Sequence, residues 1–208
     1  MPDLPFPVPA PLQAAALDAL DREGKLDRAL EALGPIAGRS VVTVAAGERQ
    51  VARWSATGAT IVAVDAIRGG ASSALGDGSA DVIVSPWAAF RGVDEAELAE
   101  ADRILRPAGR LLVLHDYGRD DLATLRGDQT EYGTWTRRDG PFLTNGFRVR
   151  VIHCFWTFDD LDAARQVVGE AFGASGQAFA AALKRPRLSW NVAIYHRTRG
   201  GAPSSHGD

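Results

Sequence analysis

The sequence predicts one α/β domain whose β-sheet is mostly parallel, carries helices on both faces and ends in an antiparallel strand. Short runs rich in Val, Ile and Leu, without polar alternation, stand at residues 41–45, 61–64, 82–84 and 110–114. Such runs are typical of parallel strands that are buried on both faces. Segments of helical length separate several of them, which is the sequence pattern of strand–helix–strand units.

The composition fits a globular domain and argues against several other classes. The chain has 208 residues, of which 46% are hydrophobic, so one domain over residues 1–199 can bury a sizeable core. We expect residues 1–9, which are proline-rich, to form an extended arm and residues 200–208 to form a disordered tail. The net charge of −3 gives no electrostatic reason to bind nucleic acid or an anionic membrane. No stretch reaches the roughly 20 apolar residues of a membrane span, and the N-terminus lacks the pattern of a signal peptide, so we expect a cytoplasmic protein.

The first third of the chain predicts a helical segment followed by a strand–helix–strand unit. Residues 10–33 predict a helix that bends near Gly24 and carries a stripe of leucines on one face. Residues 41–65 then form the unit, with a helix over residues 48–56 between its strands. Asp65 therefore stands at the carboxyl end of the second strand.

The segment that follows Asp65 is too short for another strand–helix pair. A helix of about 10 residues, a strand of about 5 and two turns need at least ~20 residues. Only residues 66–80 are available before the next strand, and four of them are glycines that disfavour regular structure. We therefore predict that the sheet lacks a third strand on this side and that residues 66–80 form a loop or at most one short helical turn.

The middle of the chain predicts a helix over residues 94–106. Asp94 is placed to cap its first turn, and Glu97 is placed to reach back to the cap. Pro107 and Gly109 end this helix before the next strand.

The last part of the chain begins with a long polar, glycine-rich connection over residues 117–146. Connections of this length inside compact domains are functional or mobile, so we predict a flap over the carboxyl edge of the sheet. A strand over residues 147–158, a helix over 160–183 capped by Asp159 and a final strand over 189–196 follow.

Three motifs in this order resemble the class I S-adenosylmethionine-dependent methyltransferases. They are the acidic residue Asp65 after the second strand, the stretch Asp77–Asp81 before the next strand, and the stretch Arg103–Leu111, where the family has R-x-L-[RK]-P-G-G-x-L and this chain has Ala108 at one glycine. The resemblance covers roughly residues 25–116. It implies a Rossmann-like sheet and S-adenosylmethionine as cofactor, with Asp65 binding the ribose hydroxyls.

The turn after the first strand departs from that family. Thr43 stands where the family has an acidic residue, Ala45 and Gly47 hold two of the glycine positions, and Arg49 replaces the third glycine. Only positions without large side chains let the backbone approach a ligand closely. The resemblance makes Ala45, Gly47 and Arg49 candidates for cofactor binding, yet Gly47 also fits a plain tight turn. Asp65 also fits a solvated strand end.

Candidate chemistry gathers where the parallel strands end, because open sheets of this kind bind ligands at the carboxyl edge. Ser85 follows one strand and is a further candidate for cofactor binding, and His115 and Asp116 follow the next. Methyl transfer needs alignment and sometimes a base, and the ordinary pKa of histidine suits that role. His115 is therefore the candidate base and Asp116 an alternative base or positioning group, although His115 also fits a structural role.

Other residues that could carry chemistry have a simpler interpretation. Four tryptophans could line an acceptor pocket, and core packing explains each equally well: Trp87, Trp135, Trp156 and Trp190. Cys154 is the single cysteine, which excludes an internal disulfide. His153 and Cys154 are neighbours on a predicted strand and point to opposite faces, so no metal site is predicted.

Two hypotheses about function remain open from the sequence. The first is a methyltransferase for a small-molecule or peptide acceptor with a weakened S-adenosylmethionine pocket. The second is a degenerate, inactive relative that acts as a binding or assembly subunit, with the shortened sheet edge covered by a second copy or a partner protein. A dehydrogenase is less compatible, because Ala45 and Arg49 replace glycines of the dinucleotide fingerprint.

Overall fold

The computed structural model describes residues 4, 6–127 and 130–200. In the predicted N-terminal arm, Leu4, Phe6 and Val8 are buried, and the Phe6 ring lies 5.1 Å from that of Trp156. The expected C-terminal tail lies outside the described residues, apart from Gly200. No helix in the described part of the chain is long and apolar enough to cross a membrane.

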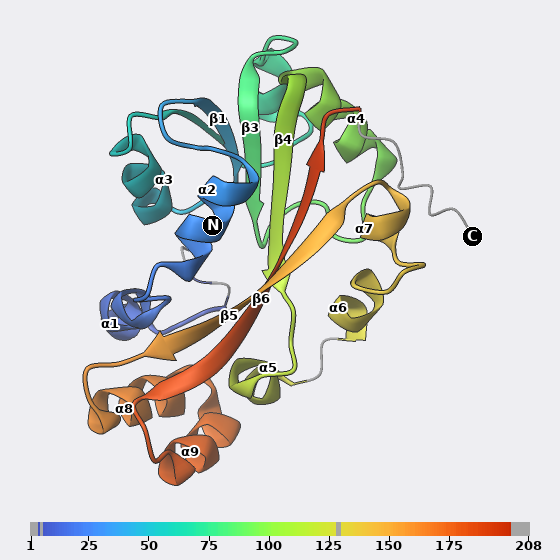
Figure 1. The fold of residues 1–208 in the computed structure, drawn as a ribbon. Coiled ribbons are helices and arrows are strands. Elements are labelled where there is room, and N and C mark those ends of the chain that lie inside the picture. The colour runs from blue at the N-terminus through green and yellow to red at the C-terminus, as the bar shows by residue number, and fades with distance from the viewer. Residues whose placement is uncertain (1–3, 5, 128–129, 201–208) are drawn as a thin grey trace.

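The described residues form a six-stranded sheet with the strand order β2-β1-β3-β4-β6-β5 (Figure 1). Its strands are β1 (Ser40–Val44), β2 (Thr60–Val64), β3 (Ala80–Pro86), β4 (Leu105–Asp116), β5 (Arg148–Thr157) and β6 (Arg187–Thr198). Neighbours from β2 to β4 pair in parallel, and β6 runs antiparallel to both β4 and β5. The α/β class, the mostly parallel sheet and the antiparallel final strand are therefore confirmed.

The sheet ends at β2, as the length of the following segment predicts. Residues 66–79, all of which the structure describes, contain one short 3₁₀ helix over Gly70–Ala74 and no strand, and β3 begins at Ala80. Val62 on β2 is 41% exposed. Because side chains two residues apart share a face, Val62 lies on the same face as the buried Val64, beyond the area that the neighbouring helices cover. The missing strand–helix pair thus leaves an apolar edge open.

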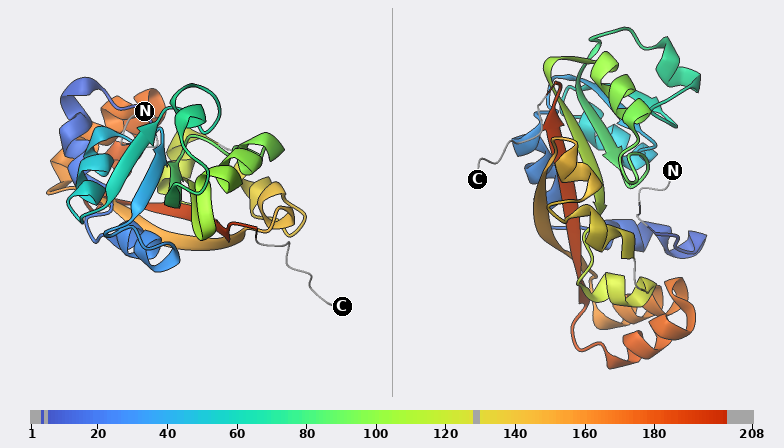
Figure 2. Two further views of the ribbon diagram at one scale, coloured as in Figure 1. Left: turned by 90° about the horizontal axis from the view of Figure 1, so that it is seen from above. Right: turned by 90° about the vertical axis from the view of Figure 1, so that its right-hand side faces the viewer.

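Helices cover both faces of the sheet (Figure 2). Alternate residues of β4 show the two layers, since Leu112 and Leu114 belong to one apolar cluster and Leu111 and Val113 to the other. The first cluster packs against α1 (Gln13–Ala19), α2 (Lys25–Leu33), α3 (Glu48–Ser55), α5 (Asp121–Arg126), α8 (Leu161–Ala171) and α9 (Gly173–Ala182). The second packs against α4 (Glu95–Ile104), α6 (Thr130–Trp135) and α7 (Pro141–Thr144).

Two of the predicted helices are each divided in the structure. The first is a 3₁₀ turn over Ala10–Leu12 followed by α1 and α2, and the chain reverses at Gly24, whose φ of +63° favours glycine. The helix predicted over 160–183 breaks at Gly173, where φ is +57°, and α9 then folds back onto α8. These breaks let short helices follow the curved sheet.

The helix caps predicted for α8 and α4 agree only in part with those in the structure. Asp160, rather than Asp159, caps α8 by accepting a hydrogen bond from the backbone N–H of Ala163 at 2.8 Å. Asp94 caps α4 as predicted. Glu97 does not reach back to that cap, because its Oε2 accepts the backbone N–H of Phe90 at 2.9 Å.

The connection over residues 117–146 carries the three short helices α5, α6 and α7. Leu122, Leu125, Trp135 and Phe142 from this segment are buried. The segment therefore forms one wall of the carboxyl edge, and its role as a movable flap stays a prediction.

Candidate functional site

The turn between β1 and α3 lies at the carboxyl edge beside the end of β2. The backbone N–H of Ala45 donates to the carbonyl oxygen of Val64 at 2.7 Å, directly before Asp65. Ala45 has φ of +53°, a left-handed conformation that glycine adopts most readily, and Gly47 precedes the first turn of α3. The chain therefore keeps the geometry of a glycine turn although alanine stands at this position.

The Arg49 side chain connects α3 to α1. Its guanidinium forms an ion pair with Asp18 of α1, with 2.7 Å between Nη2 and Oδ1. Both side chains are about half exposed. The long side chain that departs from the resembled pattern is thus held at the surface by the neighbouring helix.

Asp65 is exposed and faces a cavity of about 480 Å³, called here the Asp65 cavity. It lies between the end of β2 and the loop before α4, and its wall is formed by Asp65, Ala66, Ile67, Arg68, Ala88, Ala89, Arg91, Asp94 and Glu97. Burial raises the pKa of Glu97 above its ordinary value. Ala45, Gly47 and Arg49 are not part of this wall, so the turn and Asp65 are adjacent without sharing this cavity.

The loop between β3 and α4 is held in uncommon backbone conformations. Trp87, Phe90 and Val93 have φ of +53°, +59° and +62°. Positive φ is rare for bulky and β-branched residues, and it costs on the order of 1–3 kcal/mol at each position. Ser85 supports this loop, because its buried hydroxyl accepts the backbone N–H of Ala89 at 3.1 Å. The predicted cofactor ligand Ser85 thus has a local structural partner.

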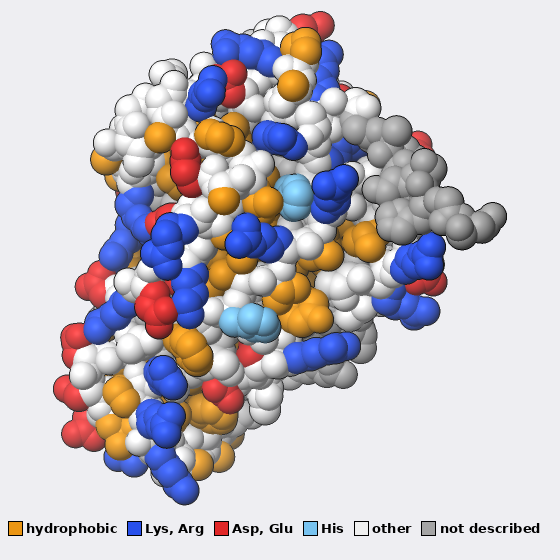
Figure 3. All heavy atoms as spheres, viewed as in Figure 1, with side chains coloured by type: hydrophobic (Ala, Val, Ile, Leu, Met, Phe, Trp, Pro, Cys, Tyr) orange, Lys and Arg blue, Asp and Glu red, His pale blue; other side chains and the backbone are white. Residues whose placement is uncertain are grey.

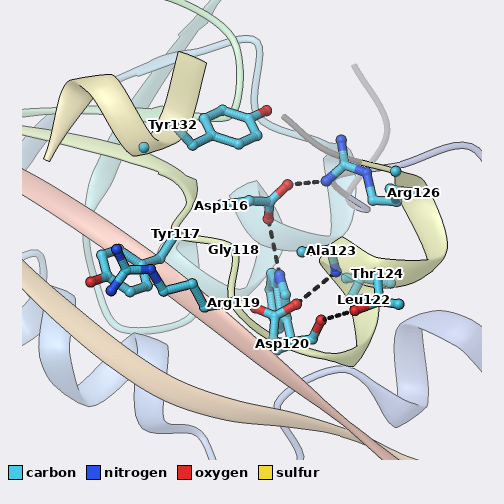
Figure 4. A pocket seen from close by; sticks show the side chains of 13 residues that line it. Asp116, Tyr117, Gly118, Arg119, Asp120, Leu122, Ala123, Thr124, Arg126 and Tyr132 are labelled. Atoms are coloured by element: carbon cyan, nitrogen blue, oxygen red, sulfur yellow. Dashed lines mark hydrogen bonds and ion pairs between the residues drawn. The ribbon is translucent and has the colours of Figure 1, made fainter. Parts of the chain in front are cut away.

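A second cavity, called here the Asp116 cavity, opens at the end of β4 and has a volume of about 510 Å³ (Figure 4). Its wall comes from the end of β4, from α5 and α6 and from β6. Asp116 is 6% exposed and has a donor for each carboxylate oxygen. Trp190 Nε1 donates to Oδ1 at 3.0 Å, and Arg126 forms a close ion pair with Oδ2. Asp116 is therefore positioned by two groups on different elements.

Asp120 adds a second carboxylate to this wall. It caps α5 through the backbone N–H of Ala123 at 2.7 Å, and it accepts the backbone N–H of Asn191 at the same distance. Burial raises the pKa of Asp120. Tyr117, Arg119 and Tyr132 also line this cavity (Figure 4).

His115 and Asp116 point to opposite faces of the sheet, because they are consecutive on β4. The structure therefore does not bring this predicted pair together. His115 lies in a closed aromatic group made by Tyr132, Trp135, Phe142 and Tyr195, with ring centroids 4.7 to 6.3 Å away. Its role as a base stays a prediction, and it requires this aromatic group to open.

The environment of His115 favours the neutral ring. Its side chain is fully buried, and neither ring nitrogen has a hydrogen-bond partner in the described part of the chain. Burial, followed by the positive charge of Arg91, lowers the pKa of His115 to about 3, while the nearby backbone of Ala89 and Phe90 acts in the opposite direction without forming a hydrogen bond of normal geometry. The imidazole is therefore uncharged across the physiological range.

The tryptophans divide between core and cavity. Trp156 is buried in the core, where its Nε1 donates to the carbonyl oxygen of Ala16 at 2.7 Å. Trp135 belongs to the aromatic group around His115. Trp190 lines the Asp116 cavity and stacks on Trp87, with 5.7 Å between ring centroids. The Trp87–Trp190 pair thus joins the end of β3 to the Asp116 cavity.

A separate charged region lies on the face of β4, β5 and β6 that Figure 3 shows, where Lys and Arg side chains run along the middle of the view. Burial, followed by the charges of Arg110, Arg148 and Arg150, lowers the pKa of His196.

Within the described residues no group of three His, Cys, Asp or Glu side chains is placed to hold a metal ion.

Sequence reasoning missed Asp120, Arg126 and Tyr132 as site residues. All three belong to the connection after β4, where no hydrophobic periodicity gave their orientation. The sequence did contain one signal for Asp120, because an aspartate directly before a helix is a typical N-cap residue.

No family model and no curated protein matches the chain. Solved structures do match its fold. A candidate type II methyltransferase from Anaeromyxobacter dehalogenans has a TM-score of 0.51 at 17% identity, over 84% of this chain and 95% of that one. A candidate methyltransferase from an antibiotic biosynthesis pathway of Anabaena variabilis also has a TM-score of 0.51, at 16% identity, over 83% of this chain and 96% of that one. The chain therefore has the Rossmann-like fold of methyltransferases.

Proposed function

We propose that this protein is an S-adenosylmethionine-dependent methyltransferase with an open, weakened cofactor site, acting on a small-molecule or peptide acceptor. The observation that carries the proposal is the retained left-handed turn at Ala45, next to Asp65 at the end of β2. Such a turn is conformationally costly for alanine, and here it lies directly beside the carboxyl end of β2. The fold supports the same conclusion.

The residues at the β2 end fit the proposed cofactor in part. S-adenosylmethionine would supply a methyl group activated by a sulfonium. Asp65 would accept hydrogen bonds from the ribose hydroxyls, and the backbone at Ala45 and Gly47 would allow close approach of the methionine portion. The missing strand–helix pair leaves one side of this site without a wall, which is why we expect weak binding.

The Asp116 cavity supports the acceptor side of the proposal. Asp116 is fixed by Trp190 and Arg126, so its carboxylate can orient an acceptor without reorganising. The ring of Trp190 lines that cavity and stacks on Trp87, which follows β3, so an apolar surface lies beside the carboxylate. His115 is turned away from the cavity, so Asp116 is the stronger candidate for positioning the acceptor.

Calorimetric titration tests the cofactor part of this proposal. We expect S-adenosylmethionine and S-adenosylhomocysteine to bind with dissociation constants in the micromolar to millimolar range, and a nicotinamide dinucleotide not to bind. Gly47→Val is the matched variant and should abolish cofactor binding. The backbone angles at Gly47, φ of −75° and ψ of 162°, suit valine, but the added side chain blocks the close approach of the cofactor to the backbone. Absence of binding by the wild-type protein at millimolar ligand would contradict the proposal.

A second candidate function is favoured by the open β2 edge. Val62 is 41% exposed on a strand whose outer backbone groups face away from the sheet. Unprotected strand edges favour pairing with another chain, so this edge would suit a second copy or a partner protein. Sedimentation of wild type and Val62→Lys distinguishes the possibilities: an assembly subunit forms a concentration-dependent dimer that the lysine weakens, whereas a monomeric enzyme gives the same result for both.

A further inference from the structure

The outer edge of β5 is covered along only part of its length. In the described part of the chain β5 is the last strand of the sheet, so one of its edges pairs with β6 and the other pairs with no strand. On this outer edge the carbonyl oxygen of Phe155 accepts the backbone N–H of Asp21 at 3.2 Å, and that of His153 accepts the Lys25 ammonium at 3.1 Å. The chain between α1 and the start of α2 therefore covers the carboxyl half of the edge.

The amino half of the same edge presents unpaired backbone groups. The register between β5 and β6 is continuous over residues 148–157, and in an antiparallel pair the backbone groups of successive residues point alternately toward and away from the partner strand. Because His153 and Phe155 point away from β6, Val149 and Val151 do so as well. Among the described residues, the N–H and C=O groups of these two valines have no hydrogen-bond partner outside the sheet. This part of the edge can therefore accept another strand.

Two arginines stand beside these groups on one face of the sheet. Arg148 and Arg150 are exposed, and they share this face with His196, which is the cross-strand neighbour of Arg148. Arg110 on β4 lies on the same face, where Figure 3 shows a run of Lys and Arg side chains. Neither Arg148 nor Arg150 forms an ion pair or hydrogen bond with another described residue. The outer edge of β5 thus carries positive charge that the described protein does not neutralise.

The spacing of the two arginines fits an extended partner. A strand rises about 3.3 Å per residue, so Arg148 and Arg150 are separated by about 6.6 Å, which is also the distance between alternate residues of any chain added beside them. Residues directly opposite in a strand pair share a face, with about 4.5–5.5 Å between their Cβ atoms. Carboxylates at alternate positions of the added chain would therefore meet both guanidiniums, and an arginine can hold a carboxylate in two parallel hydrogen bonds.

The residues between the arginines determine the rest of the pattern. Val149 and Val151 point to the opposite face of the sheet and are half-buried there. The residues of the added chain that lie opposite these valines would cover apolar surface. An alternation of acidic and apolar residues is therefore the sequence pattern that suits this edge.

We propose that the outer edge of β5 over residues 148–152 binds an extended acidic segment of a partner protein, which adds an antiparallel strand and places alternate carboxylates on Arg148 and Arg150. The same edge of a second copy does not suit this position, because it would bring arginines against arginines. Charged side chains also protect an edge from unspecific pairing, so complementary charge becomes the condition for pairing. The site lies at the opposite end of the sheet from β2 and does not depend on cofactor binding.

Three capped peptides of equal net charge test the proposal on the wild-type protein. The first is Ser-Val-Glu-Val-Glu-Val-Ser, and the second is Ser-Glu-Glu-Val-Val-Val-Ser, which has the same composition without the alternation. The third is the first peptide with N-methyl groups on its valines, whose N–H groups would face β5. Calorimetry at low ionic strength should show saturable binding of the first peptide, at least tenfold tighter than that of either control.

The double variant Arg148→Gln with Arg150→Gln removes both charges at exposed positions and should weaken binding of the first peptide about tenfold. Lys184→Gln with Arg185→Gln is the matched control, since it makes the same change in net charge at exposed positions before the other end of β6. The control should change the affinity less than twofold. Urea unfolding of both double variants verifies that each remains folded.

Amide hydrogen exchange identifies the place of binding, because the first peptide should slow exchange at Val149 and Val151. Equal affinities for the alternating and the rearranged peptide, an unchanged affinity in the arginine variant, or unchanged exchange at the two valines would each overturn the proposal. Absence of saturable binding at millimolar peptide would do the same. Tighter binding of a uridine hexanucleotide than of the first peptide would also overturn it, because the arginines would then form a nucleic-acid surface.

Discussion

At the β2 end of the carboxyl edge, Asp65 is exposed beside a strand that has no outer neighbour among the described residues, whereas at the β4 end Asp116 is buried and both its oxygens have donors. Two aspartates at strand ends of one sheet therefore have different environments, one exposed to solvent and one buried. The difference shows that one end of the edge is open to solvent while the other is closed by packing. We therefore expect equivalent substitutions at the two ends to affect different properties.

The largest expected difference is in stability. Asp116→Ala removes the partner of the largely buried Arg126 and the acceptor of Trp190 Nε1, so it should lower the free energy of unfolding by about 3–5 kcal/mol. Asp65→Ala removes an exposed carboxylate and should change it by less than ~0.5 kcal/mol. Urea unfolding monitored by circular dichroism measures both. Equal losses of stability would remove the contrast between the two ends.

A second prediction concerns pH and the face of β4 opposite Asp116. In the unfolded chain His115 takes up a proton near its ordinary pKa of 6.5, whereas in the folded protein its pKa is about 3. The unfolded state therefore binds more protons below pH 6.5, and stability falls as the pH falls from about 6.5 to about 3. Between pH 7 and pH 5 this single group should cost about 2 kcal/mol.

His115→Phe isolates that contribution, because phenylalanine suits the surrounding aromatic rings and does not titrate. Unfolding free energies of wild type and variant at pH 7 and pH 5 give the result. The wild type should lose about 2 kcal/mol more than the variant over this interval. Parallel pH dependences would mean that His115 is accessible to protons in the folded state, which would return it to consideration as a base.

A third prediction concerns the contribution of Asp65 to cofactor binding. A hydrogen bond to a charged group contributes on the order of 1.5–3 kcal/mol, so Asp65→Ala should weaken S-adenosylhomocysteine binding about tenfold or more. Calorimetric titration of the variant beside Asp162→Ala, whose side chain is 97% exposed on α8 and lines neither cavity, provides the measurement and its control. Unchanged affinity would show that Asp65 is only a solvated strand end.

The smallest expected effect belongs to Arg49. Its ion pair with Asp18 is about half exposed on both sides, so Arg49→Gln should cost less than ~1 kcal/mol of stability. The pairing holds the guanidinium at the surface, and the affinity for S-adenosylhomocysteine should change less than twofold. Clearly tighter binding by the variant would instead show that Arg49 enters the cofactor site.

Much of the sheet could be predicted from the sequence, because each parallel strand contains a short run rich in Val, Ile or Leu that is recognisable without long-range information. The missing strand was predictable for a different reason, since the 15 residues between Asp65 and Asp81 cannot hold a helix and a strand. The break at Gly173 was not predicted, because the Ala-rich sequence on both sides favours helix and only packing of α9 on α8 requires the reversal.

The candidate site was predictable only where strand ends define it. Asp65 and Asp116 follow apolar runs, so their place at the carboxyl edge could be inferred. Asp120, Arg126 and Tyr132 come from the connection after β4, where tertiary packing rather than local pattern sets the direction of each side chain. The opposite orientations of His115 and Asp116 could have been inferred from strand alternation, had the strand been predicted to extend past residue 114.

Amide hydrogen exchange with and without S-adenosylhomocysteine tests most directly whether the open end of the edge still binds the cofactor. We predict increased protection at residues 44–48, 64–68 and 88–94, which surround the turn at Ala45 and the Asp65 cavity, with little change at residues 117–126. Unchanged exchange at those three segments with millimolar ligand, or protection confined to residues 117–126, would contradict the proposed cofactor site.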